Sequence, residues 1–287
     1  MLACATATVL PVCAAPASDP VARDHAIPSC YEQLREYAPR NPIGDLTVLI
    51  DQTAYLDARL RQIVRETVDR LLRPGVNLSI ATFSAYLQGR YLDVLVSGQV
   101  EAPIDAKQRD FVSKRDLRQN EECLSDQVVF ARRLAAKNLD AAFEAIDPNI
   151  PRSDIIAALR DLSRRVGNAP ASNRMVIVVS DMLENSSITS FYRAGRLRTI
   201  DATAELRKVA AAGIRADFHD AQIFVIGAGG VSERSADDRS YRDPRALLAL
   251  EEFWRRWFAA SHAELIEFGK PTPLIRIDWK TSESRAQ

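Results

Sequence analysis

Three groups of oxygen-bearing side chains stand where strands are expected to end or a helix to begin. Asp51 and Thr53 directly follow the apolar run 46–50, Asp181 follows a second such run, and Ser153 precedes a helical stretch. Ligands of open α/β sheets bind beyond the carboxyl ends of the strands, so we expect these residues to converge there. Two carboxylates and two hydroxyls suit Mg²⁺ or Mn²⁺, with waters completing the shell. The alternative is that they are helix caps and turn residues, which favour the same side chains.

Apolar runs and helical periodicity alternate along the chain. Short β-branched runs are typical of strands buried on both faces, and apolar residues three and four apart are typical of amphipathic helices. The predicted strands are 46–50, 78–86, 91–96, 175–179, 223–226 and an edge strand at 274–279, and the predicted helices are a short one near 31–37, then 55–73, 121–146, one opening at Ser153, and 245–260. This order predicts an α/β fold, a doubly wound and mostly parallel sheet with helices on both faces.

The three polar groups also resemble the motifs of a known family. The chain reads Asp51-Gln-Thr-Ala-Tyr after the first strand, Ser153-Asp-Ile-Ile-Ala-Ala-Leu at the later helix and Ser180-Asp-Met after the 175–179 strand. These are similar to the Asp-x-Ser-x-Ser, Thr-Asp-Ile-x-x-Ala-Leu and Thr-Asp-Gly motifs of the von Willebrand factor A (vWA) domain. The resemblance covers residues 45–280 and implies a vWA/Rossmann-like domain with a metal-ion-dependent adhesion site.

Two departures make that adhesion site degenerate. Tyr55 replaces the second serine of the first motif, and Met182 replaces the glycine of the third. Asp57 is a candidate to compensate from the next turn. In this family the metal leaves one position for a partner's carboxylate, which is adhesion rather than turnover. The resemblance therefore implies a protein-binding or scaffold module with an unidentified protein partner, no catalytic residues, and a metal site formed by Asp51, Thr53, Ser153 and Asp181.

A haloacid dehalogenase-like phosphatase is the main enzymatic alternative. Its nucleophile would be Asp51, Ser180 would supply the second hydroxyl, and Asp237 and Asp238 the acidic pair, although that pair follows a polar stretch and no lysine is suitably placed. A serine hydrolase is disfavoured because Gly-x-Ser-x-Gly is absent. The three histidines have no nearby nucleophile motif and lack zinc-ligand spacing, so surface or capping roles are expected for them.

The charge balance argues against nucleic acid as the partner. Lys plus Arg and Asp plus Glu each number 38, so the formal net charge is zero and no global field attracts a polyanion. The arginines at 193, 196 and 198 are expected to form a solvated face. Trp254 and Trp257 are residue types of binding hot spots, but at helical spacing we expect them in the core, flanked by solvent-facing Arg255 and Arg256. A metal-free structural interaction protein is the remaining alternative.

The N-terminus is typical of a bacterial secretory leader. Residues 1–17 are uncharged and apolar and are followed by small residues, although no Lys or Arg precedes the run. We expect a signal peptide at 1–20, an extension at 21–44, the main domain at 45–280 and a tail at 281–287, in a periplasmic or secreted protein. The leader is too short to span a bilayer, and no transmembrane segment is predicted.

Cleavage of that leader would leave two cysteines in an oxidising compartment. Cys30 and Cys123 are then expected to form one disulfide, the alternative being two unrelated buried thiols.

Overall fold

The structure is a computed structural model of the full chain. It describes residues 25–87, 90–147, 150, 153–193, 196–230 and 243–279. The predicted signal peptide, the predicted tail and the Asp237–Asp238 pair lie outside these residues. Within them, no helix is both long enough and apolar enough to cross a membrane.

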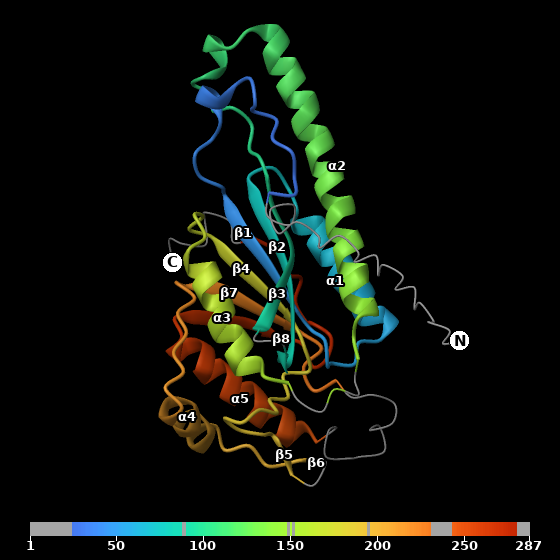
Figure 1. Ribbon diagram of the computed structural model, residues 1–287, viewed down its shortest axis with the longest axis vertical. Coiled ribbons are helices and arrows are strands. Elements are labelled where there is room, and N and C mark those ends of the chain that lie inside the picture. The colour runs from blue at the N-terminus through green and yellow to red at the C-terminus, as the bar shows by residue number, and fades with distance from the viewer. Residues whose placement is uncertain are drawn as a thin grey trace, which may run out of the picture.

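A six-stranded sheet forms the centre of the molecule (Figure 1). Its strands are β1 (Gly44–Asp51), β2 (Val76–Leu87), β3 (Arg90–Val100), β4 (Arg174–Val179), β7 (Ala221–Ile226) and β8 (Ala263–Phe268), in the order β3-β2-β1-β4-β7-β8. Every neighbouring pair is parallel except β2–β3. The predicted mostly parallel sheet is therefore confirmed.

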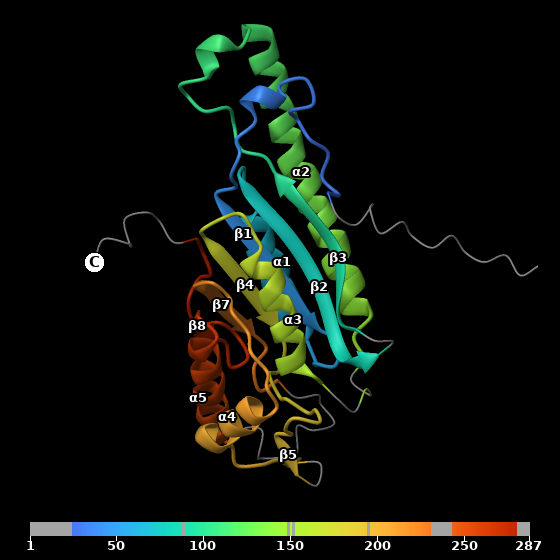
Figure 2. The same ribbon diagram turned by 60° about the vertical axis from the view of Figure 1, so that its left-hand side comes forward.

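Helices cover both faces of this sheet (Figures 1 and 2). One face carries α1 (Ala58–Leu71) and α2 (Lys114–Glu144), and the other carries α3 (Ile155–Gly167), α4 (Ala202–Ala211) and α5 (Pro244–Ala260). Strand β1 shows why both faces need cover, because all eight of its residues are buried. Leu46, Val48 and Ile50 pack towards α1 and α2, whereas Leu49 packs into the other core.

The C-terminal edge of the sheet differs from the prediction. The edge strand is β8, whereas 274–279 forms no strand and exposes 88% of Leu274. Because β8 follows α5 after a short turn and pairs directly with β7, the place beside β7 is already taken when the chain reaches 274. The end of the chain still contributes to the core through Ile277 and Trp279.

Helix α5 confirms the expected core role of its tryptophans. Trp254 and Trp257 are buried, and the Trp254 indole Nε1 donates to the carbonyl oxygen of Met182 at 2.9 Å. Leu248 of the same helix is 59% exposed. Arg255 and Arg256 lie at the surface as expected, each within salt-bridge distance of a glutamate one turn earlier.

Arg198 does not lie on the solvated face that was expected for the arginines at 193, 196 and 198. This segment forms a small hairpin of β5 (Tyr192–Arg193) and β6 (Arg196–Leu197). The Arg198 guanidinium lies 2.8 Å from the buried carboxylate of Glu205, which holds the pKa of Glu205 below its usual range together with the Thr189 hydroxyl and Lys208. Arg198 is therefore an ion-paired side chain, although the sequence suggested that it faces solvent.

An arm projects beyond the amino end of the sheet (Figure 2). Helix α2 begins at Lys114, seven residues before the predicted start, because Ser113 caps it by accepting a hydrogen bond from the Asp116 N–H. The N-terminal half of α2 packs on the short helices η2 (Arg35–Tyr37) and η3 (Arg109–Phe111) and the segments around them, in a small core that includes Tyr31 and Leu124. We call residues 26–43 and 101–124 the arm.

A disulfide between Cys30 and Cys123 closes this arm, as the sequence predicted. It joins the extended N-terminal segment to the third turn of α2, across a sequence separation of 93 residues. Tyr31 supports the same junction by donating its hydroxyl to the carbonyl oxygen of Ala102 at 2.6 Å.

Reduction of this disulfide should destabilise the protein. A loop of this length is worth about 4–5 kcal/mol by the chain-entropy argument, and less where strain or residual structure in the unfolded chain intervenes. Denaturant unfolding with and without reductant measures the difference, and a Cys30→Ser/Cys123→Ser variant should show the lower stability in both conditions. Free thiols found by mass spectrometry in protein kept under oxidising conditions would contradict the bond.

Candidate functional site

The candidate site lies where β1 and β4 end. Ile50 is paired with Val179 in the sheet, so the next residues, Asp51 and Ser180, emerge side by side. Thr53 follows in the loop after β1 and Asp181 in the loop after β4. We call Asp51, Thr53, Ser153, Ser180 and Asp181 the aspartate site.

The carboxylate of Asp51 is the centre of this site. It is completely buried, and its Oδ1 accepts hydrogen bonds from the Thr53 backbone N–H at 2.8 Å and from the Thr53 hydroxyl at 2.6 Å. Its Oδ2 accepts from the Ser180 hydroxyl at 2.7 Å and from the Ser153 hydroxyl at 3.2 Å. Four donors from three separate chain segments therefore meet on one side chain.

Ser153 reaches this site from a position that differs from the prediction. The sequence indicated that it caps α3, but Asp154 occupies the N-cap position, and the structure shows no side-chain capping bond there. Ser153 instead forms an antiparallel bridge with Asn185, with hydrogen bonds between their backbones in both directions. That bridge leaves the Ser153 hydroxyl directed at Asp51 rather than along the helix.

Asp181 brings a second carboxyl group to the same end of the sheet. Its Oδ1 accepts from the Leu183 N–H at 2.9 Å, and its carbonyl oxygen accepts from the Gly229 N–H at 2.9 Å. Burial and the neighbouring charge of Asp51 raise the pKa of Asp181 well above its usual value, and burial also raises the pKa of Asp51. The charge of Asp51 therefore disfavours ionisation of the neighbouring Asp181.

The glycine-rich segment after β7 forms a tight turn over this end of the sheet. Gly227 has φ +101°, and a side chain there would lie 3.2 Å from the Ser180 carbonyl oxygen. Gly229 has φ +66° and donates to Asp181. These positions need glycine because the turn is left-handed and packs directly on the aspartate site.

Met182 stands where the vWA motif has glycine, and its backbone has a left-handed conformation that glycine adopts without strain. It has φ +61° and is fully buried. A left-handed conformation costs a non-glycine residue about 1–2 kcal/mol, so the surroundings must impose it. The bond from Trp254 to the Met182 carbonyl oxygen is one such constraint. Met182 therefore holds a left-handed conformation that its surroundings impose.

Gln52 attaches the aspartate site to the end of α2. Its side-chain Nε2 donates to the carbonyl oxygen of Ala142 at 3.1 Å, and its own carbonyl oxygen accepts from the Asp147 N–H at 2.8 Å. Asp57, by contrast, does not compensate for Tyr55, because its carboxylate caps α1 by accepting from the Leu60 N–H at 2.7 Å.

Glu184 is a buried residue that caps α3, and nothing in the sequence indicated this role. Its side chain is fully buried, and Oε2 accepts from the Ile156 N–H at the start of α3 at 2.9 Å. Burial raises the pKa of Glu184 to about 8, and the neighbouring Asp154 acts in the same direction. Glu184 caps α3 from another segment, a role for which neighbouring sequence gives no signal.

The donor set consists of oxygen atoms and would fit a hard divalent cation better than a soft one. No group of three or more His, Cys, Asp and Glu side chains suited to a metal exists among the described residues. The available ligands are two carboxylates and hydroxyls, which suit Mg²⁺ or Mn²⁺. The hydroxyls of Thr53 and Ser153 donate their hydrogens to Asp51, which leaves their lone pairs for a cation. Tyr55 reduces the set by one hydroxyl.

No protein-family model matches this chain, and no curated protein is significantly similar to it. An aerotolerance-related membrane protein from Bacteroides fragilis, with multiple mutations to serines, aligns over 79% of this chain and 92% of its own at 12% identity and a TM-score of 0.34. The TFIIH p34 N-terminal domain aligns over 80% and 93% at 10% identity and a TM-score of 0.25.

The strand order, the one antiparallel edge strand and the position of the aspartate site beyond β1 and β4 agree with the vWA-like fold that the sequence predicted. The fold is therefore vWA-like.

Removal of the Asp51 carboxylate should destabilise the fold severely. In Asp51→Ala the Ser153 and Ser180 hydroxyls lose their buried acceptor, and we expect a loss of about 3–5 kcal/mol, as for other buried charged networks that lose one partner. Thr53→Val, which removes one of the four donors, should cost about 1 kcal/mol. Chemical denaturation measures both, and equal small losses would show that Asp51 does not hold the segments together.

Glu184 should make stability depend on pH. Because its folded pKa of about 8 exceeds the model-peptide value near 4.5, the folded state binds the extra proton between those values. Its contribution is fully present below pH ~4.5 and is lost as pH rises to ~8, at up to about 1.4 kcal/mol per pH unit. Glu184→Gln keeps an acceptor for Ile156 and should flatten the pH profile of melting between pH 5 and 8. An unchanged slope in the variant would contradict this assignment.

Proposed function

We propose that this protein is a non-catalytic binding module that engages a protein partner at the aspartate site through a bound Mg²⁺ or Mn²⁺. The observation that carries the proposal is that Asp51 and Asp181 lie at the carboxyl ends of the neighbouring strands β1 and β4, with hydroxyls whose hydrogens are already directed to Asp51. A cation here would offset the burial and the neighbouring charge that disfavour ionisation of Asp181.

Thr53, Ser153 and Asp181 are the residues that would hold the cation. Asp51 would act chiefly by accepting their hydrogens and fixing the orientation of the hydroxyl oxygens. When bound, the cation supplies an open coordination position for a carboxylate oxygen of the partner. The Asn185 bridge keeps Ser153 in place, and the turn at Gly227–Gly230 encloses the other side.

The geometry of Asp51 argues against the phosphatase alternative. A nucleophilic aspartate needs an oxygen open to an incoming phosphorus atom. Both oxygens of Asp51 accept hydrogen bonds, and none of its surface is exposed. Ser180, which would have served as the second hydroxyl, is bonded to Asp51 itself.

An exported setting is part of the proposal. The Cys30–Cys123 disulfide and the secretory character of residues 1–20 support a periplasmic or secreted protein. In that setting the partner is a protein of the envelope or the medium that presents an acidic side chain. The zero net charge supports a protein rather than a nucleic acid as the partner.

A thermal melt with Mg²⁺ or Mn²⁺ against chelator tests the cation site. A ligand at a hundredfold excess over its dissociation constant stabilises the folded state by about 2.7 kcal/mol, or roughly 5–10 °C in melting temperature for a domain of this size. Asp181→Ala and Thr53→Val should lose most of the shift, whereas Glu252→Ala, on the exposed surface of α5, should keep it.

The opposite result has an equally definite meaning. If neither cation shifts the melting temperature of the wild-type protein, the aspartate site is a structural junction only. The protein is then a metal-free interaction scaffold, in which the four hydrogen bonds on Asp51 serve the fold alone.

A further inference from the structure

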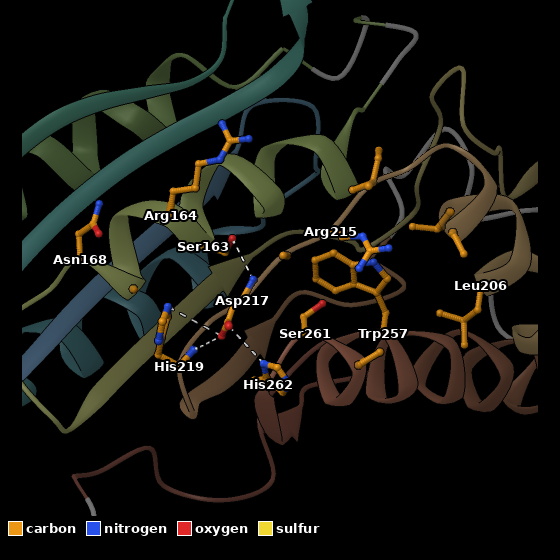
Figure 3. A pocket seen from close by; sticks show the side chains of 16 residues that line it. Ser163, Arg164, Asn168, Leu206, Arg215, Asp217, His219, Trp257, Ser261 and His262 are labelled. Atoms are coloured by element: carbon orange, nitrogen blue, oxygen red, sulfur yellow. Dashed lines mark hydrogen bonds and ion pairs between the residues drawn. The ribbon is translucent and has the colours of Figure 1, made fainter.

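A second site lies at the amino end of the sheet, away from the aspartate site. A half-open cleft of about 920 Å³ is formed where α3, α4 and α5 end, next to the turns that lead into β7 and β8 (Figure 3). Its size falls within the range of roughly 300–1,000 Å³ that is typical of small-molecule sites. Nothing in the proposed adhesion role uses it.

The floor of the cleft is apolar and firmly held. Trp257 and Val209 line it with 4% and 3% of their surface exposed, and the half-buried Leu206 and Ile214 extend it. The ring of Trp257 packs edge-to-face on Phe218 and Trp254, with centroid distances of 6.2 and 5.7 Å. A rigid indole wall of this kind suits the apolar body of a ligand.

The one acid in the cleft is already bound by its neighbours. Asp217 Oδ1 accepts from the His219 N–H at 2.9 Å, and Oδ2 lies 3.2 Å from His262 Nδ1 (Figure 3). The Asp217 N–H in turn donates to the Ser163 hydroxyl at 3.3 Å. These contacts hold the pKa of Asp217 below its usual range, while its side chain remains 49% exposed.

The two histidines of the cleft lie on strained backbone that the surrounding structure must hold in place. His219 and His262 both have left-handed φ angles, +49° and +48°. Gly167 at the end of α3 admits the His219 ring, since a Cβ at that glycine would lie 2.5 Å from the ring. Strained residues of this kind are concentrated at ligand sites.

Two arginines complete the rim and leave it positively charged. Arg215 lines the cleft and forms no ion pair with any described residue. Arg164 is 73% exposed, and its Nη1 approaches the Asp161 carboxylate only to 3.6 Å. Arg164 and Arg215 are the cationic side chains that line the cleft, and Asp217 is the one acid among its lining residues. Guanidinium groups favour carboxylates and phosphates as partners.

From an apolar floor beneath a cationic rim, we infer that this cleft binds an amphipathic monocarboxylate with an aliphatic body. The aliphatic part lies against Trp257, Leu206 and Ile214, and the carboxylate pairs with Arg215. A metal ion is disfavoured by the two arginines that line the cleft.

Calorimetric titration of the full-length protein with octanoate tests this inference. Octanoate should bind, whereas octylammonium, with the same chain and the opposite charge, and acetate, with the same head and no chain, should bind at least tenfold more weakly. Arg215→Gln should weaken octanoate binding about tenfold. The matched variant Arg207→Gln, which changes an exposed arginine of α4 outside the cleft, should leave it unchanged.

A second pair of variants tests the location independently of charge. Ala210→Trp places a ring in the cleft from an exposed position of α4 and should abolish binding, whereas Ala211→Trp, one residue on and outside the lining, should not. Equal binding of octanoate and octylammonium, or no effect of Arg215→Gln and Ala210→Trp, overturns the inference. Binding of N-acetyl-Leu-Leu without binding of octanoate would assign the cleft to peptide C-termini instead. All arms are run with chelator present, so the result is separate from that of the cation site.

Discussion

The hydrogen bonds on one buried carboxylate, that of Asp51, hold together the segments at the carboxyl end of the sheet. A carboxylate without exposed surface is costly unless its oxygens are satisfied. Here the donors come from the loop after β1, the segment before α3 and the start of the loop after β4. Segments about a hundred residues apart in sequence are thereby fixed around one point, and the left-handed backbone of Met182 and the capping by Glu184 are built onto that junction.

Much of the fold was predictable because its signals are local. The apolar runs of β1, β4 and β7 and the periodicity of α1 and α5 are properties of short windows, and parallel pairing follows from their alternation. The location of Asp51, Thr53 and Asp181 beyond strand ends was also predictable, since it needs only the strand boundaries. The hydrogen bond from Ser153 to Asp51 confirms that the residues from the second motif reach the same place.

The errors concern choices that depend on distant partners. The apolar residues of 274–279 indicated an edge strand. The strand beside β7 is instead β8, which contains Glu264 and Glu267 and follows directly after α5. Ser153 looked like a helix cap because the bridge to Asn185 lies 32 positions away in the chain. Glu184 and the left-handed Met182 gave no signal, since a buried acid and a strained backbone are imposed by packing and are not propensities.

Helix α2 ties the arm to the aspartate site. Its 31 residues span about 46 Å at 1.5 Å per residue, longer than any strand of the sheet beside it. The disulfide at Cys123 fastens it within the arm, and near its other end the carbonyl oxygen of Ala142 accepts a hydrogen bond from Gln52, the residue next to Asp51. The arm and the loop that carries Asp51 therefore cannot shift relative to each other unless α2 bends or one of these contacts breaks.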